Sequence, residues 1–141
     1  MATFLLKTEP GEYAYTDLVR EERATWTGVA NAQALATLRT MRKGDQAFIY
    51  HTDDEKAIVG LARALGDPFE DPKQPGKTEK GEPKHAVIDL APVRAVKVPV
   101  TLKAIKADER FTAFALVKQS RLSVMLVPAE LDLLIRRMAG L

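Results

Sequence analysis

The feature that most constrains the fold is a series of short apolar segments, each as long as a β-strand and each bounded by turn-forming residues. The segments cover residues 3–8, 46–52, 57–65, 86–90, 93–98 and 122–127. No long helices alternate with them, and neither GxxxxGK(S/T) nor GxGxxG occurs, which argues against a doubly wound nucleotide-binding fold. The pattern predicts an α+β fold: a curved, mostly antiparallel β-barrel of about five to six strands with short flanking helices.

Short helices are predicted where a capping residue precedes a helical period: 17–21 after Thr16, about 31–42, 102–106 after Thr101, and 129–138 after Pro128 at the first helical position. Gly60 lies inside a strand segment, which indicates a bulge or a close backbone approach. Residues 66–84 hold four prolines, three glycines and nine charged residues, so we expect a long mobile loop there. The chain is most simply a single domain spanning residues 1–141.

Composition excludes several kinds of site. The chain has no cysteine, which excludes disulfides, thiolate metal ligands and cysteine nucleophiles, and it has only two histidines. We therefore expect no metal and no cofactor. No apolar run approaches the ~20 residues of a membrane span, and the apolar stretch 4–6 is too short for a signal peptide. A cytoplasmic protein without a membrane partner is expected.

Trp26, the only tryptophan, opens the unusual segment Trp26-Thr27-Gly28-Val29-Ala30-Asn31-Ala32-Gln33-Ala34. An aromatic ring, a glycine that permits close backbone approach and two amide side chains are suited to stacking on a planar ring and reading its polar edge. The same residues also fit a buried tryptophan beside a helix that Asn31 caps. The residues alone favour the second interpretation.

Motifs spread over the chain then resemble one family. They are Phe4-Leu5-Leu6-Lys7-Thr8-Glu9-Pro10, the Trp26 segment, Tyr50-His51-Thr52, Ile58-Val59-Gly60 and Gln119-Ser120-Arg121-Leu122-Ser123-Val124. In this order, over residues 4–138, they resemble the EVE domain, a PUA-like family. The resemblance implies a PUA-like β-barrel related to the YTH readers of N6-methyladenine. It also implies a module that recognises modified bases, notably 5-methylcytosine and its oxidised forms, in an aromatic pocket.

The resemblance assigns roles to particular residues. Trp26 would stack on one modified base of DNA or RNA, taken from a single strand or flipped out of a duplex, and edge contacts would come from Thr8, Gly28, Val29, Asn31 and Gln33. Tyr50 would close the other side, with Lys7 near the phosphate, Glu9 setting the polarity and His51 close to the pocket. The phosphate and rim residues would be Lys118, Ser120 and Arg121. No catalytic residue is implied, and a monomer is expected.

Four positions depart from the usual pattern of the family. Ala30 and Leu35 stand where arginines are common, Ala32 where a tyrosine is frequent, and His85 where a tryptophan is common. A stacking contact with a base is worth about 1–3 kcal/mol, so the loss of a second aromatic face is expected to weaken base binding.

Two other functions remain open on the sequence. Related ASCH domains include small amidohydrolases that act on acylated cytidine with a Lys, a Thr and a Glu, residue types that Lys7, Thr8 and Glu9 also supply. Successive residues of a strand face opposite ways, however, so a carboxylate from elsewhere would be needed.

The other open function is that of a PUA-type RNA-binding module without preference for modification. Residues 85–121 carry seven Lys/Arg against three acidic residues, which is compatible with phosphate contacts. For catalysis by His51, the sequence offers no carboxylate at a spacing that suggests a catalytic pair.

Overall fold

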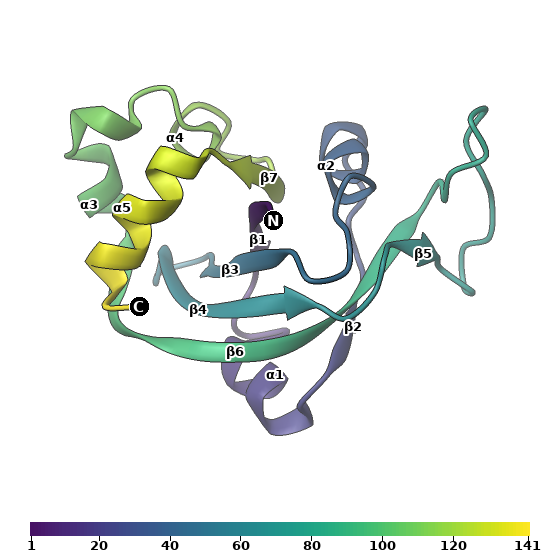
Figure 1. Cartoon of the computed structure of the whole chain (residues 1–141), viewed down its shortest axis with the longest axis horizontal. Helices are drawn as coiled ribbons and strands as arrows, with labels where there is room; N and C mark the ends of the chain where they lie inside the picture. Colours follow the sequence, from purple (N-terminus) through teal and green to yellow (C-terminus); the bar gives the residue numbers. More distant parts are fainter.

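A curled β-sheet forms the centre of the computed structural model, which describes residues 1–141 (Figure 1). Its strand order is β2-β6-β4-β3-β1-β7, and β5 pairs with β6 outside this path. The strands are β1 (Thr3–Thr8), β2 (Ala24–Trp26), β3 (Gln46–His51), β4 (Ala57–Ala64), β5 (Phe69–Glu70), β6 (Ala86–Thr101) and β7 (Val124–Val127). The predicted α+β fold with a curved sheet and short helices is confirmed, although the sheet has seven strands rather than five or six.

Strand β1 lies between two neighbours and is buried on both faces. Phe4, Leu5 and Leu6 are at most 2% exposed, as expected of a strand covered on both sides. The strand pairs antiparallel with β7 but parallel with β3, which is the one departure from an antiparallel sheet. Because β1 and β3 run in the same direction, Lys7 lies opposite Tyr50 and Thr8 opposite His51 at the same end of the sheet.

Strand β6 is a single element of 16 residues rather than the two strands predicted on either side of Pro92. Pro92 lies opposite Ala62, next to a shift in the register between β4 and β6. A proline cannot donate to the ladder, and an irregularity of this kind accommodates it within the strand. The length of β6 lets it pair with β4, β2 and β5 along its course.

Gly60 marks a close approach, as predicted. The register of β4 shifts on both of its sides near this residue, and a Cβ at Gly60 would overlap the ring of Tyr15. The Tyr15 hydroxyl donates a 2.7 Å hydrogen bond to the Leu61 carbonyl, which fixes the ring over the glycine. This contact holds the helix that begins at Tyr15 against the sheet.

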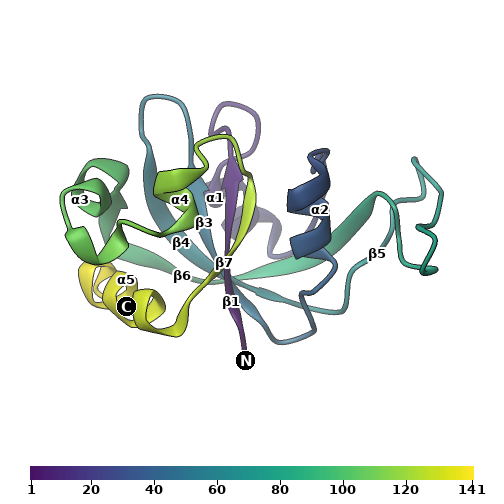
Figure 2. The ribbon, with the colours of Figure 1, turned by 90° about the horizontal axis from the view of Figure 1, so that it is seen from above.

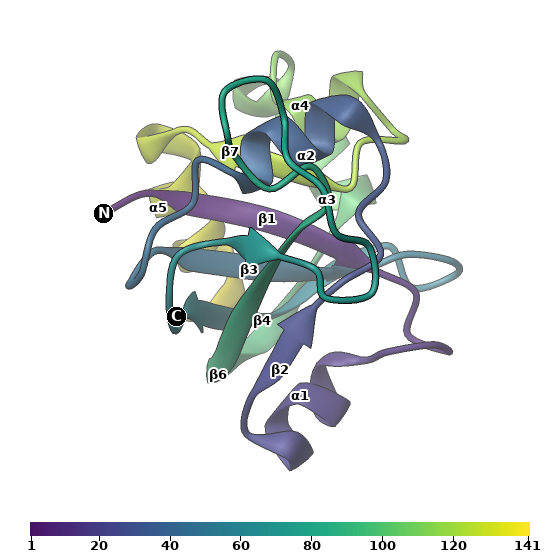
Figure 3. The same cartoon turned by 90° about the vertical axis from the view of Figure 1, so that its right-hand side faces the viewer.

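Short helices surround the sheet, as Figures 2 and 3 show from two further directions. They are α1 (Tyr15–Glu21), α2 (Ala32–Leu38), α3 (Leu102–Lys106), the 3-10 helix η1 (Glu109–Phe111), α4 (Ala115–Lys118) and α5 (Ala129–Ala139). Helix α5 packs against β6, and α2 packs against β7 and β6. None of these helices has the length and hydrophobicity of a membrane span.

The helix ends confirm some of the predicted caps and correct others. Thr101 caps α3 as predicted, because its side-chain oxygen accepts from the Ala104 N–H. Thr16 is not the cap of α1: the helix begins at Tyr15, two residues before the predicted start, and is preceded by Ala14, whose N–H donates to the Asp17 carboxylate. Helix α2 stops at Leu38, short of the predicted 42. Pro128 precedes α5 as its N-cap rather than occupying the first helical position.

The segment 66–84 is mainly loop and extends beyond β5 (Figure 2). It contains the short strand β5 and an isolated bridge between Lys77 and Pro83. Arg39, at the end of α2, donates from Nε to the Pro83 carbonyl at 2.7 Å and from Nη2 to the Lys84 carbonyl at 3.0 Å. The base of the loop is therefore attached to α2, and the predicted mobility of the segment stays a prediction.

Candidate ligand pocket

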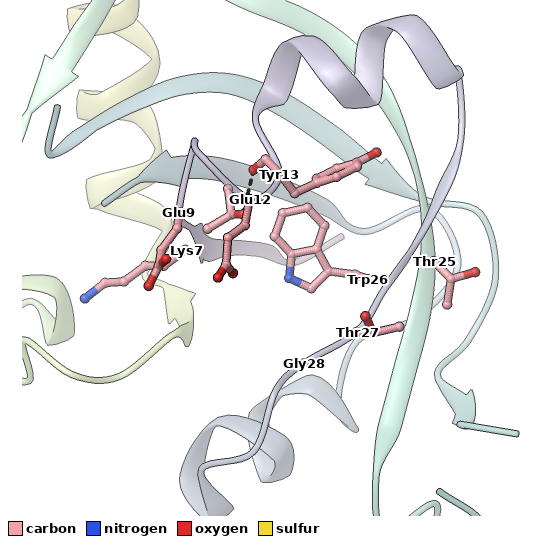
Figure 4. Close-up of a pocket in the computed structure, with 9 residues that line it drawn as sticks. Lys7, Glu9, Glu12, Tyr13, Thr25, Trp26, Thr27 and Gly28 are labelled. Atoms are coloured by element: carbon pink, nitrogen blue, oxygen red, sulfur yellow. Dashed lines mark hydrogen bonds between the residues drawn. The ribbon is translucent and has the colours of Figure 1, made fainter. Parts of the chain in front are cut away.

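A pocket of about 340 Å³ lies where the end of β1, the turn before α1 and the end of β2 meet (Figure 4). This volume falls within the ~300–1,000 Å³ of typical small-molecule sites. The pocket is lined by Lys7, Thr8, Glu9, Glu12, Tyr13, Thr25, Trp26, Thr27 and Gly28. The curl of the sheet brings these residues together, because β2 pairs with β6, and β4 and β3 separate β6 from β1.

Trp26 is both a core residue and a wall of this pocket. It is 7% exposed and belongs to the main hydrophobic cluster, and Tyr13 packs against it. Its indole N–H makes no hydrogen bond within the protein, while no buried side-chain nitrogen or oxygen is left without a partner, so the N–H is accessible. Both sequence interpretations of Trp26 therefore describe part of its environment.

Two carboxylates give the pocket an acidic side. Glu9 and Glu12 are exposed, and neither forms an ion pair. Figure 4 shows the Glu12 carboxylate between the side chains of Lys7 and Trp26. With Lys7 as the only cation in the lining, the pocket has a formal charge of −1. Carboxylates at a pocket wall accept hydrogen bonds and favour ligands that carry N–H donors.

The side chains of Lys7 and Thr8 each donate a hydrogen bond to a different backbone carbonyl. The Lys7 ammonium donates a 2.8 Å hydrogen bond to the Ser120 carbonyl and lies 5.7 Å from the centre of the Tyr50 ring. Burial lowers the pKa of Lys7. The Thr8 hydroxyl donates to the Tyr13 carbonyl at 2.7 Å, which closes the turn under the pocket. In this arrangement Lys7 is not placed to take the Thr8 proton, as an amidohydrolase mechanism would require.

The turn that follows Trp26 needs its glycine. Gly28 has a φ of +82°, a conformation that side chains with a Cβ rarely adopt, and no atom would contact a Cβ there. The glycine therefore serves the backbone at the pocket mouth. Val29, the next residue, is half-buried and packs against the core rather than lining the pocket.

Several residues that the sequence assigned to a base site lie outside this pocket. Asn31 caps α2, where its Oδ1 accepts from the Ala34 N–H at 3.0 Å. With Gln33 it lines a separate shallow depression that also contains Lys118, Ser120 and Arg121. Tyr50 lines a third depression, which shares Lys7 with the main pocket. The structure thus divides the predicted residues among three neighbouring depressions.

His51 is a buried structural residue beside this region. Its Nε2 accepts from the Tyr15 N–H at 3.0 Å, so Nδ1 carries the proton and donates to the Glu55 carboxylate at 2.8 Å. Sequence reasoning found no carboxylate partner for this histidine. The partner is Glu55, four residues on, which the turn between β3 and β4 returns to the histidine.

Glu12, Tyr13, Thr25 and Thr27 line the pocket but were missed by sequence reasoning. Their position next to Trp26 in the sequence was the one signal for Thr25 and Thr27; strand alternation was not, because neighbouring residues of a strand face opposite ways. No such signal marks Glu12 and Tyr13. No group of three or more His, Asp or Glu side chains is arranged to hold a metal ion.

The sequence model of the EVE domain matches residues 2–138. The chain belongs to the EVE domain family. Thymocyte nuclear protein 1 of Gallus gallus is 32% identical over 123 residues, which are 73% of this chain and 51% of that protein. This EVE domain spans about half the length of the curated relatives it matches.

Solved structures show the same PUA-like fold. Rpa0253 from Rhodopseudomonas palustris is 37% identical, with a TM-score of 0.88 over 99% of this chain and 94% of that one. The human THYN1 protein in complex with 5-methylcytosine-containing DNA is 26% identical, with a TM-score of 0.84 over 98% of each chain. An ASCH protein from Zymomonas mobilis, 12% identical with a TM-score of 0.60 over 97% of this EVE domain and 95% of that chain, shares the fold alone.

The departures from the family pattern have different structural consequences. Leu35 is 5% exposed and part of the core, so it cannot face a ligand. Ala30 and Ala32 are exposed and His85 is half-buried, and none of the three lines the pocket. Tyr13 supplies a second aromatic side chain in this EVE domain, although its ring meets Trp26 by an edge.

Proposed function

We propose that this chain is a nucleic-acid-binding domain that takes one modified base, of the 5-methylcytosine type, into the pocket beside Trp26. The observation that carries the proposal is the combination of an accessible indole N–H with the carboxylates of Glu9 and Glu12 in one cavity of base size. The DNA complex of the human THYN1 protein supports it, because that structure has the same fold and binds DNA that contains 5-methylcytosine.

The chemistry of the pocket favours cytosine over thymine. Cytosine presents an exocyclic amine, and glutamate is a suitable acceptor for it. Thymine and uracil present a carbonyl oxygen at the same place, which a carboxylate repels. The base would reach the pocket from a single strand or by flipping, and contacts with Trp26 would offset the unstacking free energy.

The free energy by which a protein can discriminate a single methyl group is limited. A single methyl group in an apolar site discriminates by about 1–3 kcal/mol, or roughly 10–200-fold. We therefore propose a moderate preference for 5-methylcytosine over cytosine, exercised by residues 1–141 as a single domain and a monomer. No catalytic step is part of the proposal. The phosphate and rim roles of Lys118, Ser120 and Arg121 stay predictions.

The test follows Trp26 fluorescence while short single strands and duplexes are added. Each oligonucleotide carries one central 5-methylcytosine, 5-hydroxymethylcytosine, N4-acetylcytosine, cytosine or thymine. Saturable quenching that is strongest for a modified cytosine and weakest for thymine is expected. Equal affinity for 5-methylcytosine and thymine would overturn the proposal. Equal affinity with a steep salt dependence would instead support an RNA- or DNA-binding module without preference for modification.

A charge variant assigns the binding to this pocket. Glu12 is exposed and its side chain makes no hydrogen bond within the protein, so Glu12→Gln leaves the fold intact. Charge-assisted hydrogen bonds are roughly twice as strong as neutral ones, so affinity for 5-methylcytosine should fall about tenfold. Glu130→Gln, at the exposed start of α5, is the matched control. Mass analysis of N4-acetylcytosine after incubation completes the test, because loss of the acetyl group would establish an amidohydrolase.

A further inference from the structure

A second depression of about 260 Å³ adjoins the base pocket, and Lys7 lines both. Figure 4 shows the Lys7 side chain extending away from Trp26, so its ammonium lies on the far side of the pocket wall. The Ser120 carbonyl holds this ammonium at 2.8 Å and occupies one of its three donors. The remaining two protons are free for a ligand.

The charge of the second depression is opposite to that of the base pocket. Its lining contains Lys7, Lys56 and Lys106 against one acid, Asp53. No carboxylate lies within 4.0 Å of the three ammonium groups. The lining thus has a formal charge of +2, compared with −1 around Trp26. A phosphate is repelled by Glu9 and Glu12 and attracted to the adjoining depression.

A backbone hydrogen bond joins the two segments that carry Lys56 and Lys106. Lys56 has a φ of +44°, which is unusual for a side-chain-bearing residue, and its carbonyl accepts a 2.8 Å hydrogen bond from the Leu102 N–H at the start of α3. Lys106 ends the same helix. The turn between β3 and β4 and helix α3 therefore present their lysines to one depression.

Tyr50 supplies a neutral donor at the floor. Its side chain is 3% exposed, and its hydroxyl makes no hydrogen bond within the protein although no buried oxygen lacks a partner. The hydroxyl is therefore accessible from the depression that Tyr50 lines. Burial raises the pKa of Tyr50, so the hydroxyl keeps its proton and can donate.

We propose that this depression binds the phosphate ester that flanks the base held beside Trp26, with Lys7, Lys56 and Lys106 as cationic partners and Tyr50 as a donor. The proposal rests on the proposed function, because the base pocket sets where the phosphate lies. It keeps Lys7 near the phosphate, as the sequence predicted, but has Lys56 and Lys106 in place of the predicted Lys118 and Arg121. Lys118 and Arg121 line the other depression, which shares only Ser120 with the one that Tyr50 lines.

The experiment compares three ligands of increasing length: 5-methyl-2′-deoxycytidine, its 5′-monophosphate, and a trinucleotide with 5-methylcytosine in the middle. Binding is followed by Trp26 fluorescence and, for a labelled trinucleotide, by anisotropy. The protein variant is Lys56→Gln/Lys106→Gln, whose exposed side chains are not needed for the fold. Lys80→Gln, an exposed lysine of the segment 66–84, is the matched control.

The double variant should bind the nucleoside like the wild type and the trinucleotide at least tenfold more weakly, with a lower dependence on salt. If the double variant also binds the monophosphate more weakly, the depression holds the phosphate on the 5′ side of the base. If only its affinity for the trinucleotide falls, the depression holds the phosphate on the 3′ side. Tyr50→Phe should give a smaller loss. Full trinucleotide affinity in the double variant would overturn the proposal.

The two proposals fail in different ways. Selective quenching of Trp26 that is insensitive to the lysine variant would leave the base pocket standing and remove the phosphate site. Lysine-dependent anisotropy without any change in Trp26 fluorescence would remove the base pocket and leave an anion site at Lys56 and Lys106.

Discussion

The ring of Tyr13 meets the indole of Trp26 edge-on, with 6.0 Å between the ring centres and 85° between the planes. Such edge contacts are a favoured geometry for aromatic pairs. The Tyr13 hydroxyl donates to the Glu21 carboxylate of α1 at 2.6 Å, so the pocket wall and the helix are joined through one side chain. Burial raises the pKa of Tyr13, and the hydrogen bond to Glu21 adds to the effect. The pocket wall therefore depends on the packing of α1.

Because Trp26 is also a core residue, we expect Trp26→Ala to lower the free energy of unfolding by about 3–5 kcal/mol. Trp26→Phe should cost less, because most of the apolar ring is kept while the accessible N–H is removed. Urea denaturation followed by circular dichroism measures both, since the fluorescence reporter is lost. An alanine variant as stable as the wild type would show that the ring is not packed as described.

Asn31 allows a second test, because two roles were possible for it and the structure shows one, the cap of α2. Asn31→Ala should lower the free energy of unfolding by about 1 kcal/mol, and Asn31→Asp should keep the cap. If Asn31 also reads a base, Asn31→Asp will alter the affinity for 5-methylcytosine oligonucleotides at unchanged stability. Thermal unfolding and the fluorescence titration together separate the two roles.

Much of the fold could be predicted from the sequence because its signals are local. The apolar segments that became β1, β3 and β4 are bounded by turns, and the side-chain pattern marks their ends. The residues of a strand do not specify which other strand it pairs with, so the parallel pairing of β1 with β3 was not foreseen. The three-residue strand β2 was missed because it is too short to show a period.

Part of the candidate site could be predicted, because the family motif already pointed to Lys7, Thr8 and Glu9, which line the pocket. Trp26 and Gly28 stand out in any reading, and both line the pocket. Glu12 and Tyr13 line it because of the turn after Pro10, a three-dimensional path that the sequence does not display. The family resemblance assigned Asn31 to the base, whereas the residues alone favoured a helix cap, and the structure shows this cap.

Acid should weaken the attachment of α1. The Asp17 carboxylate accepts from the Ala14 N–H at 2.8 Å and from Arg20 at 2.6 Å, and these two contacts lower the pKa of Asp17, the backbone contact most. A carboxyl group whose pKa is lower in the folded state stabilises the fold above its unfolded pKa, near 4, and loses that contribution as the pH falls through the folded pKa. The melting temperature of Asp17→Ala should therefore be below that of the wild type at pH 7, and the two should converge below about pH 4. Thermal scans from pH 2 to pH 7 measure this, and a constant difference over that range would contradict it.

The contact between Gly60 and Tyr15 gives the sharpest prediction for the fold. A Cβ at position 60 would overlap the Tyr15 ring, which cannot move aside because its hydroxyl is bound to the Leu61 carbonyl. Overfilling a packed site usually costs about 1–3 kcal/mol, so Gly60→Ala should lower the free energy of unfolding by at least that much.

Gly66 provides the matched control, because no atom lies within 4 Å of a Cβ built there and its φ is not in the left-handed region. Gly66→Ala should change stability little or raise it by up to about 1 kcal/mol, since alanine restricts the unfolded chain. In the double variant Gly60→Ala/Tyr15→Leu, the smaller side chain removes the overlap, so the two changes should be less than additive. Urea denaturation of the wild type, Gly60→Ala, Tyr15→Leu and the double variant measures the coupling. If Gly60→Ala is as stable as Gly66→Ala, the backbone of β4 does not approach the ring as closely as the structure indicates. The anchoring of α1 beside the pocket must then come from the Tyr13 and His51 contacts and from the buried side chain of Leu18.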